Sequence, residues 1–307
     1  MSKLPPTTTQ PNITDLRAND QAVPRLWTLG RLAEDARAAN TERYQARRDG
    51  HRLGPALTGF PSLQRELGGA FATGVHFLHG DPGSGKTALA LQIAHTCGCP
   101  SLYLTCEISA EVILHRLMAR CAQIPFNRFG AGEVSPEQWD TAIAKVMKTG
   151  SMLNILDATL GPADDTRIDD AAAAVRMQHA EPGFLLAIDS VHSWTLGLYP
   201  TVLEYERLAW GISSCRQIAN RLSCPVLGLA ERNRASMGSG GMSAAAGHRG
   251  FEFAAESVWD LKYRQDNCEG DETQVTLLLP KNRNGGRDRS VDLWFNGKYQ
   301  FFREAAL

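Results

Sequence analysis

The sequence of 307 residues lacks several features that would place it in common protein classes. It has no apolar run of ~18 residues, the length a membrane-spanning helix needs, so no membrane partner is expected. The polar segment 1–21 contains no apolar core of a secretory signal. The seven cysteines are odd in number and lack the spacing of a disulfide framework. These absences favour a protein of the reducing cytoplasm.

A strong net charge and the usual spacing of metal ligands are also missing. The 32 basic and 33 acidic residues leave a net charge of −1, so any contact with nucleic acid must come from a local patch. The close pair Cys97 and Cys99 lacks the C-x-x-C spacing of zinc sites, which favours buried thiols over a metal site. Apolar residues make up 43% of the chain, enough for a sizeable core.

One stretch matches the phosphate-binding loop of nucleotide hydrolases, G-x-x-x-x-G-K-[ST], without a mismatch. It consists of Gly80, Asp81, Pro82, Gly83, Ser84, Gly85, Lys86 and Thr87. An apolar run precedes it and strong helix formers follow it, so a strand, a turn and a helix start would present several backbone N–H groups to one anion. Lys86 is expected to reach the β- and γ-phosphates, and the Thr87 hydroxyl to hold Mg²⁺. The loop therefore predicts binding of a nucleoside triphosphate.

The chain divides into three predicted parts. Residues 1–22, polar and rich in threonine and proline, are expected to form a disordered tail. Residues 23–56 are expected to form an amphipathic linker helix and a connector, and residues 57–307 the main domain. The helix has leucine and alanine at three- and four-residue spacing, so its apolar stripe must pack on its own domain or on a neighbouring subunit.

The main domain alternates short apolar runs with helical stretches. This pattern predicts an α/β fold with a mostly parallel sheet flanked by helices. The expected strands are residues 75–79, 101–105, 153–156, 184–188 and 225–230. The expected helices are residues 86–96, 110–122, 136–147, 167–179 and 203–222. Near the end, β-rich segments 273–279 and 291–295 flank an Asn-Gly-Gly turn and predict a C-terminal β-hairpin.

Two acids follow predicted strands and are candidates for the chemistry. Asp189 ends an apolar run and is expected to hold Mg²⁺ together with Thr87. Glu107, just after the strand 101–105, would orient and deprotonate the attacking water. The alternative for Glu107 is an acid that the dipole of the following helix stabilises. Position alone leaves these two interpretations open.

Two cations, Lys281 and Arg283, lie at the end of the strand that precedes the hairpin turn. Side chains alternate along a strand, so both are expected to project from one face. Such a pair is usually solubilising; in a nucleotide hydrolase the alternative is an arginine finger donated to the neighbour's γ-phosphate. Pro280, just before them, indicates an edge strand that could reach a second subunit.

With these residues placed, the sequence resembles the motor domain of DnaB-type replicative helicases, which are RecA-like ATPases, over residues 57–303. The similar segments, in the family's order, are residues 58–63, 67–69, 80–87, 107–111, 116–119, 227–234, 252–258 and 281–285. The resemblance implies a RecA-like ATPase core that binds ATP and Mg²⁺ between the subunits of a homo-oligomer, a ring taken as a hexamer or a filament. It implies that Glu107 is the catalytic base and that Lys281 and Arg283 act on the neighbouring subunit's nucleotide.

The sequence also departs from this family. Glu231 stands where the family has a glutamine that senses the γ-phosphate, and an acid there would alter sensing or repel the nucleotide unless it is paired. The DNA-facing loop, residues 235–247, has no lysine or arginine. Arg232, Arg234 and Arg249 border that loop and are the candidate contacts to nucleic acid.

Two further departures concern the segment after Asp189 and the start of the chain. The family has an aromatic-leucine-glutamine sequence where this chain has Ser190, Val191 and His192. The residues before the main domain do not resemble the family's primase-contacting domain. Only the linker-like helix remains, which in the family packs on the adjacent subunit.

The leading hypothesis is an ATP-hydrolysing oligomeric motor on single-stranded DNA, a helicase or translocase of DNA replication. Two alternatives stay open. One is a RecA-like ring- or filament-forming ATPase that serves recombination or regulation without unwinding, which the loop without basic residues favours. The other is an assembly module in which nucleotide cements the subunits, which the acid at Glu231 favours.

Overall fold

The computed structural model describes residues 26–50, 54–69, 71–179, 181, 183–231, 250–286 and 288–305. The predicted tail 1–22 and the predicted DNA-facing loop 235–247 lie outside these residues. The chain separates into two units, residues 1–51 and 52–307. Among the described ranges, no helix combines the length and the apolar character that crossing a bilayer requires.

The described residues of the first unit, 26–50, contain one long helix, α1 (Leu29–Arg48). Thr28 caps it, because its side chain accepts a hydrogen bond from the backbone N–H of Arg31. Two arginines, Arg47 and Arg48, occupy the last turn, where they complement the negative end of the helix dipole. A helix is therefore present where the sequence predicts one, and its N-terminal boundary is set by this cap.

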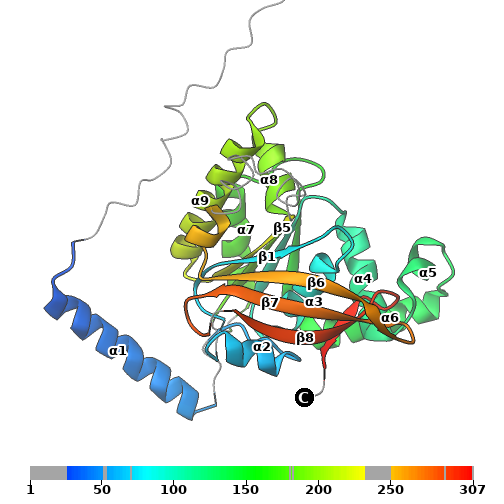
Figure 1. The fold of residues 1–307 in the computed structure, drawn as a ribbon, viewed down its shortest axis with the longest axis horizontal. Helices are drawn as coiled ribbons and strands as arrows, with labels where there is room; N and C mark the ends of the chain where they lie inside the picture. The colour runs from blue at the N-terminus through cyan, green and yellow to red at the C-terminus, as the bar shows by residue number, and fades with distance from the viewer. Residues whose placement is uncertain are drawn as a thin grey trace, which may run out of the picture. The chain divides into compact units, whose positions relative to one another are not determined.

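The second unit is built on a mixed sheet, whose nine strands in the described part of the chain have the order β3-β2-β4-β5-β1-β6-β7-β8-β9 (Figure 1). The strands are β1 (Gly74–Gly80), β2 (Ser101–Thr105), β3 (Leu153–Asp157), β4 (Leu185–Asp189), β5 (Pro225–Glu231), β6 (Ser257–Glu269), β7 (Glu272–Asn282), β8 (Arg289–Asn296) and β9 (Phe301–Glu304). Strands β1 to β6 pair parallel with one another, and β6 to β9 pair antiparallel. The predicted α/β class is confirmed.

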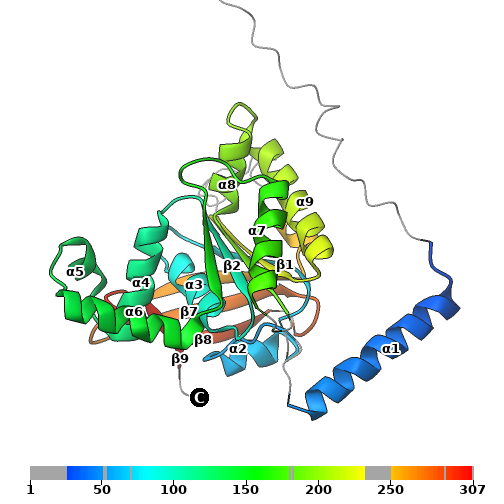
Figure 2. The same ribbon diagram turned by 180° about the vertical axis from the view of Figure 1, so that it is seen from behind.

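Helices cover both faces of the parallel part of the sheet (Figures 1 and 2). They are α2 (Pro61–Glu66), α3 (Lys86–Thr96), α4 (Ala110–Ala122), α5 (Phe126–Gly130), α6 (Pro136–Gly150), α7 (Asp165–Gln178), α8 (Val191–Leu198) and α9 (Glu204–Leu222). Leu78 packs in the core with α3, α4 and α6, whereas Phe77 packs in the core with α7, α8 and α9. Successive residues of β1 enter different cores because strand side chains alternate.

The helices begin where the sequence supplies caps. Ser109 caps α4, and Asp164 caps α7, each accepting a hydrogen bond from a backbone N–H in the first turn. Ser135 and Gln138 form a reciprocal capping box at the start of α6. These local signals explain why the predicted starts of α4, α6 and α7 lie within two residues of the observed ones.

The position of Pro280 corrects one prediction. Pro280 indicated an edge strand, but β7 lies between β6 and β8. The pairing of β7 with β6 shifts register between the pairs Asp260–Leu278 and Val258–Lys281. Pro280 falls inside this irregularity, so its missing N–H interrupts no regular ladder bond.

Candidate functional site

Four segments singled out by the sequence meet at one edge of the sheet. In the strand register Gly80 lies opposite Glu231, and Thr105 lies opposite Asp189. The carboxyl ends of β1, β2, β4 and β5 therefore share one edge, which is where open parallel sheets bind ligands. The phosphate loop, Glu107, Asp189 and Glu231 all follow or end these strands.

The phosphate loop spans the turn between β1 and α3. Gly83 and Gly85 have φ angles of +79° and +89°, a left-handed conformation that favours glycine. A Cβ atom on Gly85 would come within 2.8 Å of the Phe302 ring, so a side chain has no room there. Ser84 is buried, and its hydroxyl has no hydrogen-bond partner in the part of the chain that the structure describes. A buried polar atom of this kind is suited to a ligand oxygen, so the loop fits a phosphate.

Lys86 at the start of α3 is folded back on the loop. Its Nζ donates to the backbone carbonyls of Gly80, at 2.8 Å, and Asp81, at 3.1 Å. Burial lowers the pKa of Lys86, whereas the carboxylates of Glu231 and Asp189 oppose this shift. The cation therefore lies at the mouth of the loop, where phosphate charge would offset its desolvation.

Thr87 and Asp189 are in direct contact. The Thr87 hydroxyl donates to Oδ2 of Asp189 at 2.7 Å, and the Tyr103 hydroxyl donates to the same oxygen at 2.7 Å. Asp189 is only 4% exposed. Burial raises its pKa, and the two hydroxyl donors oppose this shift. A hydroxyl and a carboxylate beside a phosphate loop are the oxygen donors that Mg²⁺ takes, so these residues fit the ion.

Tyr103 was not predicted from the sequence. It lies in the middle of β2, and its ring is fully buried. A buried phenol hydroxyl between two leucines needs a polar partner, and this requirement is the signal that could have identified it. The sequence does not name that partner, because 86 residues separate Tyr103 from Asp189.

Glu107 is exposed in the turn between β2 and α4. Its Oε1 accepts hydrogen bonds from the hydroxyls of Ser190 and Ser193, the latter at 2.8 Å. Helix α4 starts three residues later and is capped by Ser109, so Glu107 lies outside the helix. Its carboxylate is held by the start of α8, which follows Asp189 directly.

Glu231 ends β5 and is exposed beside Gly80. Its backbone N–H donates to Nδ1 of His192 at 3.4 Å. Burial lowers the pKa of His192, while Glu204 and Glu231 oppose this shift. The acid that replaces the glutamine of the resembling family therefore lies beside the phosphate loop.

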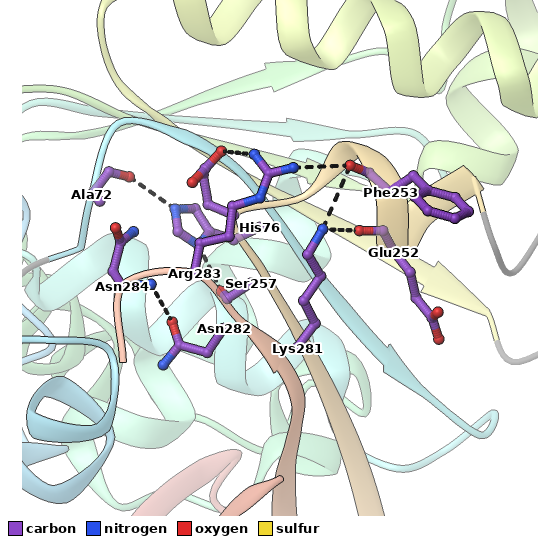
Figure 3. Close-up of polar contacts among 10 residues, drawn as sticks. Ala72, His76, Glu252, Phe253, Ser257, Lys281, Asn282, Arg283 and Asn284 are labelled. Atoms are coloured by element: carbon purple, nitrogen blue, oxygen red, sulfur yellow. Dashed lines mark hydrogen bonds and ion pairs between the residues drawn. The ribbon is translucent and has the colours of Figure 1, made fainter. Parts of the chain in front are cut away.

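Lys281 and Arg283 lie on β7 and just after it, two strands from β1, with Lys281 level with the middle of β1 and Arg283 level with its start. In the register Asn282 pairs with Ser257, and Ser257 pairs with His76 near the start of β1. Asn282 therefore lies roughly 13 Å along the strand direction from Gly80, and Arg283, level with Val75, lies roughly 16 Å from it. Both cations lie on one face, as predicted, and both donate to the carbonyl of Phe253, Arg283 at 3.2 Å and Lys281 at 3.5 Å (Figure 3).

The candidate contacts to nucleic acid, Arg232, Arg234 and Arg249, lie outside the described residues. They flank the segment that connects β5 to Gly250. Their assignment therefore stays a prediction from the sequence.

Curated relatives are helicases and a repair protein. The chain is 26% identical to the replicative DNA helicase DnaB of Treponema pallidum (strain Nichols), over 96% of this chain and 65% of that protein. It is 26% identical to DnaB of Nostoc sp. (strain PCC 7120 / SAG 25.82 / UTEX 2576), over 64% of this chain and 22% of that protein. A segment covering 21% of this chain and 14% of the relative is 46% identical to the DNA repair protein RadA of Mycobacterium tuberculosis (strain ATCC 25618 / H37Rv). The chain thus spans less than two thirds of the length of these relatives.

Solved structures show the same fold. A separately solved ATPase domain matches with a TM-score of 0.72 at 18% identity, over 89% of this chain and 98% of that one. A DnaB-like replicative helicase, solved to examine its interactions with primase, matches with a TM-score of 0.69 at 16% identity, over 96% of this chain and 70% of that one. The model of the DnaB-like helicase C terminal domain family matches residues 56–304. This chain therefore belongs to the DnaB-like helicase C-terminal domain family, and its main unit has the fold of a RecA-like ATPase domain.

Proposed function

We propose that this protein hydrolyses ATP as an oligomeric motor on single-stranded DNA, a helicase or translocase of DNA replication that acts in the cytoplasm. The main support is the separation of two sets of residues. The phosphate loop and Asp189 lie at the carboxyl end of β1, whereas Arg283 is level with Val75, roughly 16 Å along the strand direction from Gly80, and its side chain is bound to Glu256 and Phe253. An arginine finger at that distance cannot serve its own subunit's nucleotide.

The proposed assembly places ATP between neighbouring subunits. One subunit contributes the phosphate loop, Asp189 and Glu107, and the next contributes Lys281 and Arg283. A head-to-tail arrangement of this kind closes into a ring, here a hexamer, or continues as a filament. Helix α1 is the proposed linker that packs its apolar stripe, which includes Leu29 and Leu32, on the adjacent subunit.

The proposed chemistry is in-line attack of water on the γ-phosphate. The loop N–H groups and Lys86 bind the phosphates, and Glu107 orients the water and accepts its proton. Arg283 and Lys281 of the neighbour stabilise the charge that develops on the phosphoryl oxygens, a contribution typically worth roughly 10³–10⁵ in rate for an arginine finger. Mg²⁺, which Thr87 and Asp189 would hold, neutralises phosphate charge when bound.

A second candidate function is that of a RecA-like ATPase in recombination or repair that does not unwind DNA. Two observations favour it. The predicted DNA-facing loop 235–247 contains no lysine or arginine. The segment of highest identity among the relatives described above matches a DNA repair protein at 46%. The proposed DNA contacts are then Arg232, Arg234 and Arg249 alone.

ATP hydrolysis by the full chain, measured with and without single-stranded DNA across salt concentrations and beside a forked-duplex unwinding assay, tests the proposal. The motor predicts stimulation by DNA together with unwinding. Stimulation without unwinding supports the second candidate, and no DNA binding at low salt contradicts both. Replacing Arg232, Arg234 and Arg249 by alanine should weaken DNA binding and reduce its salt dependence. Lys86→Ala, which removes the phosphate-binding cation, is the inactive control.

Arg283→Ala tests the shared site. We expect hydrolysis to fall by roughly 10³-fold or more while nucleotide binding stays nearly unchanged, because the finger acts on the transition state. Dilution below the assembly concentration should lower the specific activity of the unaltered protein in the same way. A monomer that hydrolyses ATP at the full rate would contradict the shared site.

A further inference from the structure

Arg283 is held by a neighbouring segment of its own chain, residues 250–256 (Figure 3). Its NH1 donates to Oε1 of Glu256 at 2.8 Å, and its NH2 donates to the carbonyl of Phe253 at 3.2 Å. The Nζ of Lys281 donates to the carbonyl of Glu252 in the same segment. Both cations of the hairpin therefore lie on one support.

This support is fixed to β1. Phe251 is only 3% exposed and packs edge-on against the rings of Phe77, at 4.6 Å, and His79, at 5.1 Å, between centroids. The backbone N–H of Glu256 donates to the carbonyl of Val75 at 2.7 Å. The strand that carries the phosphate loop thus also carries the support of the finger, which contacts β1 from Val75 to His79.

The backbone that carries Arg283 is fixed as well. The N–H of Arg283 donates to the carbonyl of Glu256 at 2.8 Å, and the Asn282 side chain donates to the carbonyl of Glu66 at 2.6 Å. A Cβ atom on Gly285 would lie 2.0 Å from that same Glu66 oxygen, so only glycine allows the turn to approach α2 this closely. With the backbone fixed on both sides, the remaining freedom of the finger is that of its side chain.

The Arg283–Glu256 pair is not explained by stability. The two side chains are 50% and 25% exposed, and ion pairs in such positions contribute little to folding because water screens them. The pair does restrict the orientation of the Arg283 guanidinium. Within the described part of the chain, NH1 and NH2 each use one N–H in these bonds, and a guanidinium has five N–H groups, so three are left to face an anion.

We propose that Glu256 is a positioning residue for the arginine finger. It holds the Arg283 guanidinium, together with the carbonyl of Phe253, in the orientation in which the free N–H groups meet the phosphate of the adjacent subunit. The inference rests on the proposed function, since it assigns a partner to the finger of that function. A side chain that is fixed before it binds loses less conformational freedom in the transition state. Glu256 would therefore lower the activation free energy of hydrolysis.

Mixed assemblies separate the two roles of a subunit. Lys86→Ala subunits supply only a finger, and Arg283→Ala subunits supply only a nucleotide site, so their mixture should recover hydrolysis that neither variant has alone. Glu256→Ala is then added to one member at a time. In the finger donor it should lower the recovered kcat roughly tenfold to a hundredfold, the range a small misplacement costs, with KM nearly unchanged. In the site donor it should have no effect.

Two further variants control for charge and for folding. Glu256→Gln keeps the shape and the accepting oxygen, and should retain most of the recovered rate. Glu252→Gln removes a nearby charge whose carboxylate points away from Arg283 (Figure 3), and should change nothing. Unfolding of each variant by urea identifies any loss of structure.

The outcomes distinguish the inference from the function on which it rests. Failure of the Lys86→Ala and Arg283→Ala mixture to recover activity overturns the shared site and the inference with it. Recovery that Glu256→Ala leaves intact in the finger donor overturns the inference alone. An equal loss from both donors also overturns it, because a general structural defect does not depend on which role the subunit plays.

Discussion

The hydroxyl of Thr87 donates to the carboxylate of Asp189 at 2.7 Å, although 102 residues separate them in the sequence. The contact forms because α3 begins at the edge of the sheet where β4 ends, and β4 lies two strands away from β1. Tyr103 of β2, the strand next to β4, donates to the same carboxylate. Two consecutive elements, α3 and β2, and the distant strand β4 thus build one set of polar groups.

Replacing Asp189 by asparagine should remove the metal dependence of nucleotide binding. The neutral amide keeps the contacts to Thr87 and Tyr103 but lacks the charge that a divalent cation requires. We expect hydrolysis to fall about 100-fold or more, since metal stabilisation of the transition state is worth several kcal/mol. ATP affinity measured with Mg²⁺ and with EDTA should become equal. A retained Mg²⁺ dependence would contradict the assignment.

Replacing Glu231 by glutamine should raise ATP hydrolysis. Glu231 is exposed beside Gly80, so its charge opposes that of bound phosphates. Two like charges a few ångströms apart in water repel each other by ~1 kcal/mol, which corresponds to about a fivefold change in rate or affinity. Steady-state kinetics of Glu231→Gln at low and high salt measures the effect. An unchanged rate would show that the acid is a spectator.

Replacing Ser193 by alanine should slow hydrolysis severalfold while nucleotide affinity stays constant. The Ser193 hydroxyl is one of two that hold Oε1 of Glu107, and losing it gives the proposed base more orientations. Ser193→Thr keeps the hydroxyl and should retain the rate. If both variants behave alike, the hydroxyl does not position Glu107.

Replacing Gln92 by leucine should destabilise the domain. The Gln92 side chain both donates to the carbonyl of Phe302 and accepts from its N–H, at 2.8 Å each, and so ties β9 to α3. Leucine would leave two buried backbone groups without partners, at a cost of about 2–4 kcal/mol. Urea unfolding measures the change. A loss below ~1 kcal/mol would indicate that water reaches these groups.

Stability should fall between pH 6.5 and pH 4. Burial lowers the pKa of His76 from 6.5 to about 4, although its bond to the carbonyl of Ala72 opposes this, and burial likewise lowers the pKa of His95 to about 4. Both rings stay neutral in the folded chain while the unfolded chain takes up protons, so stability is complete above pH 6.5 and is lost as the pH falls. Each ring should cost about 2 kcal/mol at pH 5.

Urea unfolding at pH 7 and pH 5 tests this pH dependence. The two histidines together lower the free energy of unfolding between pH 7 and pH 5. Replacing His76 by glutamine should remove about half of this decrease, because His95 still titrates. An unchanged difference between the two pH values in His76→Gln would contradict the role of His76. Replacing His179, in the C-cap position of α7, is a control for a general effect of losing a histidine.

Elements with strong local signals were predicted closely from the sequence. Strand β2 and helices α3 and α4 have the predicted bounds, because an apolar run, a phosphate loop and the Ser109 cap define their ends locally. Strand β6 was missed. Its residues include Asp260, Lys262 and Arg264, and it becomes a strand because β1 and β7 lie on either side of it. Strand β9 was also missed. It has only four residues, and its pairing with β8 makes it a strand.

The sequence by itself determined the phosphate loop. Its two glycines with positive φ angles of +79° and +89°, its lysine and its threonine all lie within eight consecutive residues. A local sequence pattern is therefore sufficient to predict the loop. Only the tertiary structure decided the contact of Thr87 with Asp189 and the distance of Arg283 from that loop. Both depend on the order and direction of strands in the sheet, and these follow from pairings between residues far apart in the chain, which a local pattern does not encode.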